Sequence, residues 1–390
     1  MHLIKLMNIA FLSTYPPREC GLATFTQDLV TQLSTMQATS KSKIVAVSDG
    51  NYLYGDKVMM ELSQNDKSSY VKTADTLNQS DIELLVIEHE YGIYGGDCGE
   101  YLLELVNLLQ IPFVMTLHTV LPEPNEKQRH ILNVLGQKSK KIVTMAKNTV
   151  ETLQNVYGID KAKIEVIHHG VPFIPMKSRE NLKLETGFEN RSVISTFGLL
   201  GPGKGLEYGV EAMAEVAKNH KEALYLILGQ THPAIKKESG EDYRSTLQEM
   251  VRKLGISDNV QFVNKYLTKE EIVRYLKMSD IYLTPYLNKD QAVSGTLAYA
   301  AGYGRVIVST PYSYAKEMLS EGRGLLTNFR DAQSIADSIE YVLDNPEEKE
   351  KMEYKTNEIG KTMMWKQVAE EYKQLFTDVL RQDEEAKAIA

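Results

Sequence analysis

Four glycines and a lysine lie close together near the middle of the chain, and they could bind phosphate. The glycines are Gly198, Gly201, Gly203 and Gly205, and Lys204 lies among them. An apolar run at 193–197 precedes them and apolar positions at helical spacing follow at 206–217, which predicts a strand, a glycine loop and a helix. This arrangement presents backbone N–H groups and the positive end of a helix dipole to an anion. The spacing is not that of a P-loop, and the alternative is a tight turn with a solvated lysine.

A second stretch also has the residues of an anion site. Ser294, Gly295 and Thr296 stand directly before an apolar helical run at 297–302. Ser and Thr are preferred at helix N-caps, so capping alone would explain them. The other interpretation is a site where unpaired N–H groups at the helix start bind an anion. Gln291 adds a side-chain amide just upstream.

His118 ends an apolar stretch at 112–117 that predicts a strand. A lone histidine is often a hydrogen-bonded structural residue, but its place at the carboxyl end of a strand makes a catalytic role equally plausible. Glu88, His89 and Glu90 are consecutive, so they alternate across an extended chain and cannot all face one ligand. We therefore expect no metal site from these three.

Two series of alternating strands and helices must position these residues. Six apolar runs predict the strands of the first series, at 8–13, 43–47, 82–87, 112–117, 141–145 and 163–168. Residues 50–80 show no clear period, and a second series starts at 193–197. Alternation of this kind is typical of doubly wound parallel sheets, so we expect an α/β protein with two such domains.

The domain boundaries follow from composition. We expect one domain at 1–172, a linker rich in Pro, Lys and Glu at 173–190, and a second domain at 191–362. A closing amphipathic helix at 363–385 is expected to pack back on the first domain. Because open α/β sheets bind ligands beyond the carboxyl ends of their strands, two facing domains would line one cleft with the residues above.

Bulk properties exclude several classes of protein. The chain has 390 residues and a net charge of −8, which argues against general nucleic-acid binding. No apolar run reaches the length of a membrane span, and the start has no signal-peptide cleavage site, so we expect a cytoplasmic protein. Cys20 and Cys98 have no spacing for zinc or a redox pair. A local basic excess at 127–141 is read as a solvated face, with peripheral contact to anionic lipid as the alternative.

Several segments, in order, resemble one known family. They are STYPPRECG, TLHT, KIEVIHHGV, FGLLGPGKGLEYGVEAM, SGTLAYAAGYGRVIVST and WKQVAEEYKQLF. The chain resembles the retaining glycosyltransferases of family 4 over about residues 8–380, and within them the mannosyltransferase-like branch. The resemblance implies the GT-B fold, which has two facing Rossmann-like domains and a C-terminal crossover helix, with the acceptor on the first domain and the donor on the second.

The resemblance also implies roles for single residues. Gly21 matches the N-terminal loop that closes over donor phosphates and acceptor, and His118 matches a histidine near the donor sugar. Lys204 matches the basic residue on the donor pyrophosphate, while Tyr266 and Leu267 fall where the base is held.

The phosphate and sugar loop of the family matches the stretch from Gln291 to Leu297. Its expected contacts are Gln291, Ser294, Gly295 and Thr296, together with the glycines Gly198, Gly203 and Gly205 of the first loop.

Three positions depart from the family pattern. An arginine usually follows the first glycine of the phosphate loop, where this chain has Leu199. The family also carries two glutamates eight positions apart, near the donor sugar and on the ribose, where this chain has Lys289 and Leu297. One basic contact and both carboxylates are therefore missing.

The leading interpretation is an enzyme that transfers a hexose, with mannose as a candidate, from a nucleotide sugar to a carbohydrate or lipid-linked acceptor. Catalysis would rest on positioning and on stabilising the departing phosphate, with His118 and Lys204 as the catalytic residues. The family implies retention and no metal cofactor. Two alternatives stay open: a glycoside phosphorylase on the same scaffold, and a non-catalytic protein that keeps the fold.

Overall fold

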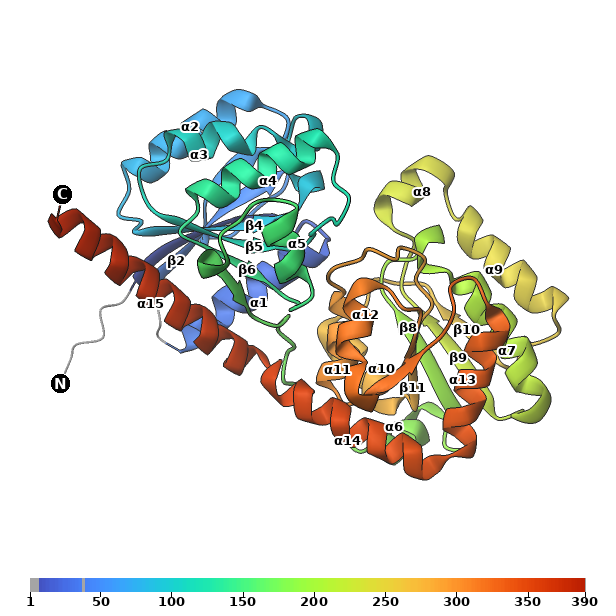
Figure 1. The fold of residues 1–390 in the computed structure, drawn as a ribbon. Helices are drawn as coiled ribbons and strands as arrows, with labels where there is room; N and C mark the ends of the chain where they lie inside the picture. The colour runs from blue at the N-terminus through green and yellow to red at the C-terminus, as the bar shows by residue number, and fades with distance from the viewer. Residues whose placement is uncertain (1–6, 37–38, 390) are drawn as a thin grey trace. The chain divides into compact units, whose positions relative to one another are not determined.

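Two parallel β-sheets organise the computed structural model, which describes residues 7–36 and 39–389. The chain forms two units. Unit 1 comprises Met1–Gly170 and Trp365–Ala390, and unit 2 comprises Val171–Met364. Each unit has its own sheet with helices on both faces (Figure 1). The expectation of two doubly wound α/β domains is therefore confirmed.

The sheet of unit 1 has seven strands in the order β3-β2-β1-β4-β5-β6-β7, and every pairing is parallel. The strands are β1 (Met7–Ser13), β2 (Thr39–Ser48), β3 (Val58–Ser63), β4 (Leu84–His89), β5 (Phe113–Leu117), β6 (Lys141–Thr144) and β7 (Ile164–Val166). All six residues of β4 are buried, as expected of a central strand covered on both faces.

Six helices complete unit 1. They are α1 (Gly21–Thr35), α2 (Lys67–Asn78), α3 (Leu102–Leu108), α4 (Glu126–Lys138), α5 (Thr149–Asn155) and α15 (Trp365–Ile389). Helices α2, α3 and α4 pack side by side over one face of the sheet, while α15 packs against α1 on the other (Figure 1). The last helix thus brings Trp365, Tyr372 and Phe376 into the core of unit 1, where all three are buried.

The sheet of unit 2 has six parallel strands in the order β10-β9-β8-β11-β12-β13. The strands are β8 (Ser192–Phe197), β9 (Ala223–Leu228), β10 (Val260–Val263), β11 (Ile281–Thr284), β12 (Val306–Ser309) and β13 (Gly324–Leu326). The two sheets share one topology: the chain winds outward from a central strand, then returns to pair on that strand's other side.

Nine helices are described in unit 2. They are α6 (Arg179–Thr186), α7 (Leu206–Asn219), α8 (Pro233–Ser239), α9 (Asp242–Lys253), α10 (Lys269–Met278), α11 (Gly295–Gly302), α12 (Ser313–Met318), α13 (Ala332–Asp344) and α14 (Pro346–Thr362). Helix α7 packs between α9 and α13, and its apolar face joins the strands in one core. Helix α11 packs against α14.

Some elements lie where the sequence pattern was weak. The unassigned residues 50–80 contain β3 and α2, and residues 173–190, expected as a linker, contain α6. Strand β3 is an edge strand with only Leu62 fully buried, so it has no apolar run to reveal it. Helix α6 buries only Leu182 and otherwise carries polar residues.

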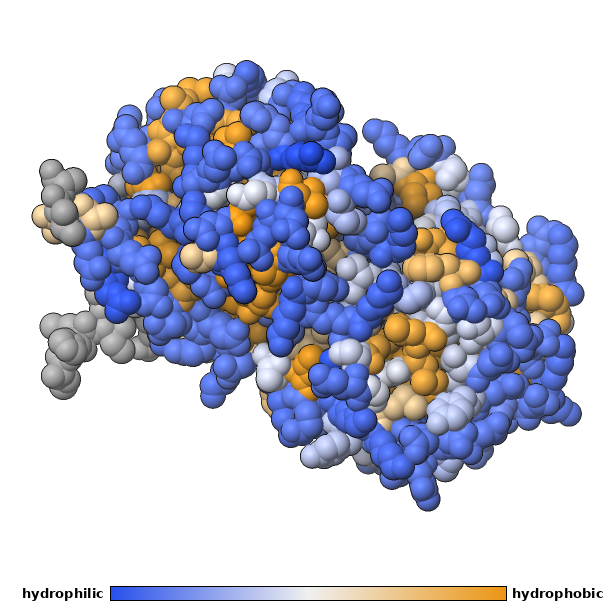
Figure 2. All heavy atoms as spheres, viewed as in Figure 1, coloured by the Kyte–Doolittle hydropathy of each residue, from blue (hydrophilic) through white to orange (hydrophobic). Residues whose placement is uncertain are grey.

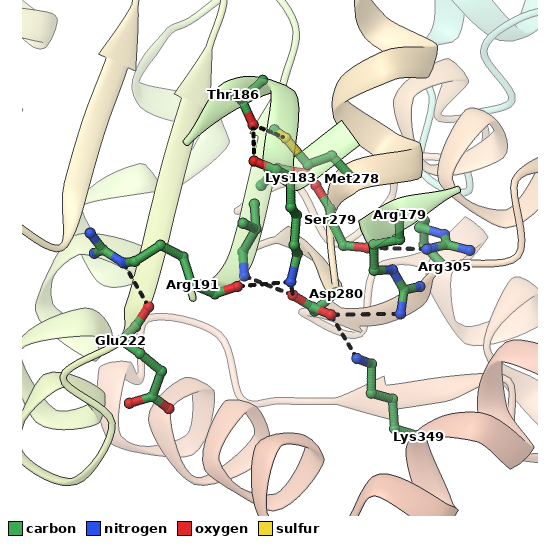
Figure 3. A network of polar contacts seen from close by, with 12 residues as sticks. Arg179, Lys183, Thr186, Arg191, Glu222, Met278, Ser279, Asp280, Arg305 and Lys349 are labelled. Carbon is green, nitrogen blue, oxygen red and sulfur yellow. Dashed lines mark hydrogen bonds and ion pairs between the residues drawn. The ribbon is translucent and has the colours of Figure 1, made fainter. Parts of the chain in front are cut away.

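A network of charged side chains anchors α6 and α14 at the amino end of β11. Asp280 directly precedes β11 and is nearly buried, with Lys183 at 2.5 Å and Lys349 at 2.7 Å from its carboxylate oxygens (Figure 3). Arg179 lies 3.6 Å from the same carboxylate. Asp280 also accepts the backbone N–H of Val193 at 2.9 Å, so one side chain joins two helices to the sheet.

Hydrophilic residues cover most of the face that each unit presents in Figure 2, with apolar residues visible between them. Large apolar side chains with more than half of their surface exposed are few among the described residues: Leu53, Phe173, Leu184 and Tyr354. No helix in the described ranges has both the length and the apolar character that a membrane crossing needs.

Candidate functional site

In each sheet the strand order changes direction between two neighbouring central strands. Ligands of open α/β sheets bind at this point, beyond the carboxyl ends of the strands. The reversal lies between β1 and β4 in unit 1, and between β8 and β11 in unit 2. The loop before Gly21 follows β1, and the glycine loop at 198–205 follows β8. The residues predicted from the sequence therefore lie at the two edges where a site is expected.

In unit 1, His118 lies beside a buried carboxylate that sequence reasoning did not connect with it. Strands β4 and β5 pair so that Glu88 lies opposite Thr116, which leaves His118 just beyond the end of β5. The Nε2 atom of His118 is 2.8 Å from Oε2 of Glu88. Because Nε2 donates to this carboxylate, Nδ1 is the ring nitrogen left for a ligand.

The burial of Glu88 determines what this pair can do. Its side chain has no exposed surface, and Oε1 makes no hydrogen bond to any residue that the structure describes. Removing one partner from such a pair leaves an uncompensated polar group inside the protein, which is strongly destabilising. Glu88 therefore holds the imidazole of His118 in one orientation.

An aromatic ring also packs against His118. The ring of Phe25, on α1, meets the imidazole edge to face with 4.9 Å between the centroids. Phe25 also contacts His169 and Trp365, at centroid distances of 5.2 Å and 5.1 Å. A ring held by packing on one side and by a carboxylate on the other has little freedom to rotate.

Two further imidazoles lie near His118, and both are electrically neutral at pH 7. Burial lowers the pKa of His89 to about 4, with a smaller contribution from His118. Burial likewise lowers the pKa of His169 to about 4. The carboxylate of Glu90 accepts a hydrogen bond from the hydroxyl of Thr119, whereas that of Glu88 pairs with His118.

Gly21 is the first residue of α1, and a Cβ atom built there meets no atom within 4 Å. The preceding residue, Cys20, is the N-cap, and its sulfur accepts the N–H of Ala23 at 3.4 Å. Thr14 contacts the same sulfur at 2.9 Å. The thiol is thus used in closing the first turn of the helix, and Gly21 leaves open space beside it.

In unit 2, two glycines of the loop are required by the backbone. Gly198 has φ +130° and Gly205 has φ +60°, conformations that other residues rarely adopt. A Cβ atom at Gly205 would also lie 2.2 Å from the carbonyl oxygen of Pro285, after β11. The glycine loop therefore packs directly on the segment that follows β11. Gly203, by contrast, has nothing within 4 Å of a built Cβ.

Lys204 lies against an aromatic ring from that segment. Its ammonium nitrogen is 3.9 Å from the centroid of the Tyr286 ring. The hydroxyl of Tyr286 is 2.8 Å from Oγ1 of Thr296, at the start of α11. Tyr286 was not predicted as a site residue, yet it contacts residues of both predicted anion loops.

The expectation that α7 offers free N–H groups to an anion is wrong at its first turn. Lys204 and Gly205 donate their N–H groups to carbonyl oxygens inside the loop, at 2.9 Å and 3.1 Å. The N–H of Leu206 donates to the hydroxyl of Tyr243, which in turn donates to Glu207. A tyrosine from α9 has taken the place that an anion was expected to fill.

Other backbone donors remain open at this edge. Within the part of the chain that the structure describes, the N–H groups of Leu199, Gly201, Gly295 and Thr296 donate no hydrogen bond. The loops that carry them are close, because a Cβ atom at Gly198 would lie 3.3 Å from Cγ2 of Thr296. Together with Lys204 they make one cationic and four amide donors, a set suited to an anion.

The other predicted residues of the second loop are partly engaged. Ser294 is the N-cap of α11, since its Oγ accepts the N–H of Leu297 at 3.3 Å and contacts Thr296 at 3.2 Å. The side-chain amide of Gln291 donates to the carbonyl oxygen of Val293 at 3.0 Å. Both predicted roles of Ser294, as cap and as site residue, remain compatible with this geometry.

The positions that depart from the family pattern differ in environment. Leu297 has no exposed surface and belongs to the core under α11, whereas Lys289 is exposed.

The two residues predicted to hold the base also differ in exposure. Tyr266 is 43% exposed and Leu267 is 7% exposed, and both follow the edge strand β10. Strand β9 lies between β10 and β8 in the sheet. Tyr266 and Leu267, which follow β10, are therefore two strands away from the glycine loop, which follows β8.

Family comparisons agree with this geometry. Residues 178–359 match the model described as "Glycosyl transferases group 1", and residues 93–173 match "Glycosyltransferase Family 4". Over these two ranges the chain is similar to the glycosyltransferases that the two models describe. The first match includes both predicted anion loops of unit 2, and the second includes His118.

Curated relatives carry related names. An uncharacterized glycosyltransferase of Methanocaldococcus jannaschii is 26% identical over 249 residues, which are 62% of this chain and 59% of that protein. A D-inositol 3-phosphate glycosyltransferase of Corynebacterium efficiens is 24% identical over 292 residues, 70% of this chain and 67% of that protein. The match thus spans about three fifths to two thirds of each relative's length.

Solved structures share the GT-B fold. Anabaena HepE in complex with UDP has a TM-score of 0.77 at 14% identity, with 95% of this chain and all of that chain covered. Sucrose-phosphate synthase of Thermosynechococcus elongatus has a TM-score of 0.77 at 14% identity, with 96% of this chain covered. The predicted GT-B fold class is confirmed by these likenesses.

Proposed function

We propose that this protein transfers a hexosyl group from a nucleoside diphosphate sugar to a carbohydrate or lipid-linked acceptor. The observation that carries the proposal is the donor set of unit 2, where Lys204 and the N–H groups of Leu199, Gly201, Gly295 and Thr296 lie at the reversal point of the sheet. The matches to glycosyltransferase family models support it, and the HepE structures of similar fold contain UDP and UDP-glucose.

The proposed reaction is a substitution at the anomeric carbon of the donor. The bond from that carbon to the diphosphate oxygen breaks, and the electron pair leaves with the nucleoside diphosphate. The acceptor oxygen bonds to the same carbon, and its proton passes to a phosphate oxygen of the leaving group. Lys204 and the open N–H groups stabilise the charge that grows on the diphosphate. The proposal includes no metal cofactor, and it takes retention from the resemblance.

His118 has a separate role in the proposal. Held by Glu88 through Nε2, it presents Nδ1 to the transferred sugar as a hydrogen-bonding group in a fixed orientation. Restricting the ring in advance lowers the cost of organising the transition state. Mannose is the first sugar to test, because the sequence resembles the mannosyltransferase-like branch.

A second candidate function has one observation in its favour. Leu297 is fully buried at the position where the family pattern has the carboxylate on the ribose. A glycoside phosphorylase would need phosphate at this edge but no ribose contact. Such an enzyme would cleave an oligosaccharide only when inorganic phosphate is present, and would not bind a nucleotide.

Thermal-shift measurements with UDP, GDP, their hexose conjugates and inorganic phosphate separate these functions. A ligand that binds only the native protein raises its melting temperature with concentration. We expect one nucleoside diphosphate to raise it and to be released from its sugar conjugate during turnover. A response to phosphate alone would favour the phosphorylase, and no response to any of them would contradict both enzymes.

A further inference from the structure

Tyr286 lies between the two loops to which the proposed function assigns the donor diphosphate. It follows β11 directly after Pro285, and its side chain is 1% exposed. One face of its ring carries the ammonium of Lys204, 3.9 Å from the centroid. Its hydroxyl lies 2.8 Å from Oγ1 of Thr296. One buried side chain therefore contacts the key residue of each loop.

The ring is held firmly in this place. It stacks on the ring of Tyr312 with 5.6 Å between the centroids and 16° between the planes. The backbone carbonyl of Tyr286 accepts the hydroxyl of Thr310 at 2.5 Å. The next residue, Leu287, donates its N–H to the carbonyl of Gly203 at 3.0 Å, which ties the same segment to the glycine loop. The ring is thus a rigid support and not a mobile neighbour.

The two contacts have different physical effects. A lysine ammonium is attracted to the electron-rich face of an aromatic ring, and the attraction strengthens away from bulk water. Lysine otherwise has four rotatable bonds and loses much freedom when it binds a phosphate. An ammonium already held over Tyr286 has lost part of that freedom before the anion arrives. The hydroxyl contact similarly orients Thr296, whose N–H is one of the open donors.

We propose that Tyr286 is a positioning residue for the donor diphosphate, which pre-orients Lys204 through its ring and Thr296 through its hydroxyl. The inference rests on the proposed function, because it assigns the diphosphate to these loops. Tyr286 itself touches no phosphate in this account. Its contribution passes through the ammonium of Lys204 and the first turn of α11.

Two substitutions separate the ring from the hydroxyl. Tyr286→Phe keeps the ring face and removes the contact to Thr296, while Tyr286→Leu removes both. Isothermal titration calorimetry with UDP, GDP and inorganic pyrophosphate gives the dissociation constants. We expect weakening of about threefold for Tyr286→Phe and about tenfold or more for Tyr286→Leu. Tyr225→Phe is the matched control, since it loses a 2.8 Å contact to Thr196 inside the core and should leave affinity unchanged.

A double-mutant cycle distinguishes positioning from simple packing. If the ring acts through Lys204, the ring effect disappears in a Lys204→Met background, and Tyr286→Leu then weakens binding only about as much as Tyr286→Phe does. An equal tenfold loss in both backgrounds, or unchanged affinity in Tyr286→Leu, would overturn the inference. If the protein bound pyrophosphate but neither UDP nor GDP, the result would count against the proposed function. The double-mutant cycle could then still be measured with pyrophosphate and would still test the role of Tyr286. Binding of none of the three probes would overturn both.

Discussion

A single side chain stands out at each candidate edge. In unit 2 it is Lys204, whose ammonium is held over the ring of Tyr286. In unit 1 it is His118, held by the buried Glu88. The two residues differ in how they are constrained: a ring face leaves the N–H groups of the lysine able to turn toward a phosphate, whereas a hydrogen bond directs the histidine.

Replacing Lys204 by alanine should weaken binding of the nucleoside diphosphate by about 1.5–3 kcal/mol, because a charge-assisted hydrogen bond to phosphate is lost. Calorimetric titration of the wild-type and variant proteins measures the difference. The melting temperature should hardly change, since the side chain is only partly buried. Equal affinity in a folded variant would remove Lys204 from the phosphate site.

Replacing His118 by alanine should lower turnover by at least about tenfold, because a polar group held in position near the reacting bond is lost. Glu88→Gln should lower turnover in the same direction, since it keeps the shape but not the charge that orients His118. Release of nucleoside diphosphate from the sugar donor measures both. His130→Asn, on the exposed side of α4, is the control. Normal turnover in the two variants would show that the pair is structural.

The pKa of His89 predicts how unit 1 responds to acid. Burial lowers this pKa to about 4, below its ordinary 6.5, so the unfolded state binds more protons between these values. The stabilisation is complete above about pH 6.5 and is lost as the pH falls toward 4, by about 3 kcal/mol at the lower end. Fluorescence of the single tryptophan, Trp365, follows unfolding of unit 1.

His89→Gln should make the free energy of unfolding less dependent on pH over this interval, while His130→Asn should not. If the variant lost stability with acid as steeply as the wild type, the titration of His89 would not be the cause.

Among the elements, α6 and α14 are attached to the sheet of unit 2 through charged side chains. Burial alone would raise the pKa of the Asp280 carboxyl, but Lys349 and Lys183 lower it below its ordinary value. The carboxylate is therefore ionised at neutral pH and pairs with both lysines, as Figure 3 shows. These pairs explain how a short helix that buries one leucine is attached to unit 2.

Asp280→Asn should destabilise unit 2 by about 3–5 kcal/mol, because Lys183 and Lys349 would lose their buried counter-charge. Denaturant unfolding followed by far-UV circular dichroism measures the loss. The control is Glu358→Gln in α14, which breaks an exposed pair with Lys361 and should cost under about 1 kcal/mol. Equal effects for the two substitutions would mean that the Asp280 network adds little stability.

Helices and strands were predicted well from the sequence where many of their side chains are buried, because burial gives an apolar run or a regular spacing of apolar residues. They were predicted poorly where few side chains are buried. Strand β9 is apolar throughout and strand β4 is apolar over its first four residues, and both were predicted. The edge strand β3 and helix α6 bury too few side chains to show a period. In the site, the glycine loop and His118 were predicted at the correct edges of their sheets.

Other site residues depend on contacts between distant parts of the chain. The hydroxyl of Tyr243 caps α7 from another helix, so the sequence could not show that this position is filled. Glu88 could have been found from one signal: it is a charged residue at the end of a fully buried strand next to the strand that ends at His118. Tyr286 offered no such signal, because its two partners become neighbours only in the folded sheet.

At the scale of the whole molecule, the same topology occurs twice. Each unit has a parallel sheet that reverses at a central strand, and each places its candidate residues at the carboxyl edge of that reversal. Unit 2 carries the anion donors, and unit 1 carries the histidine and carboxylate.

A crystal structure with bound UDP or GDP, whichever raises the melting temperature, tests the central claim most directly. We expect diphosphate oxygens within hydrogen-bond distance of the Lys204 ammonium and of the N–H groups of Gly295 and Thr296. The ammonium should still lie over the ring of Tyr286. A diphosphate bound away from the loops at 198–205 and 291–296, or a nucleotide whose phosphates contact neither Lys204 nor α11, would contradict the claim.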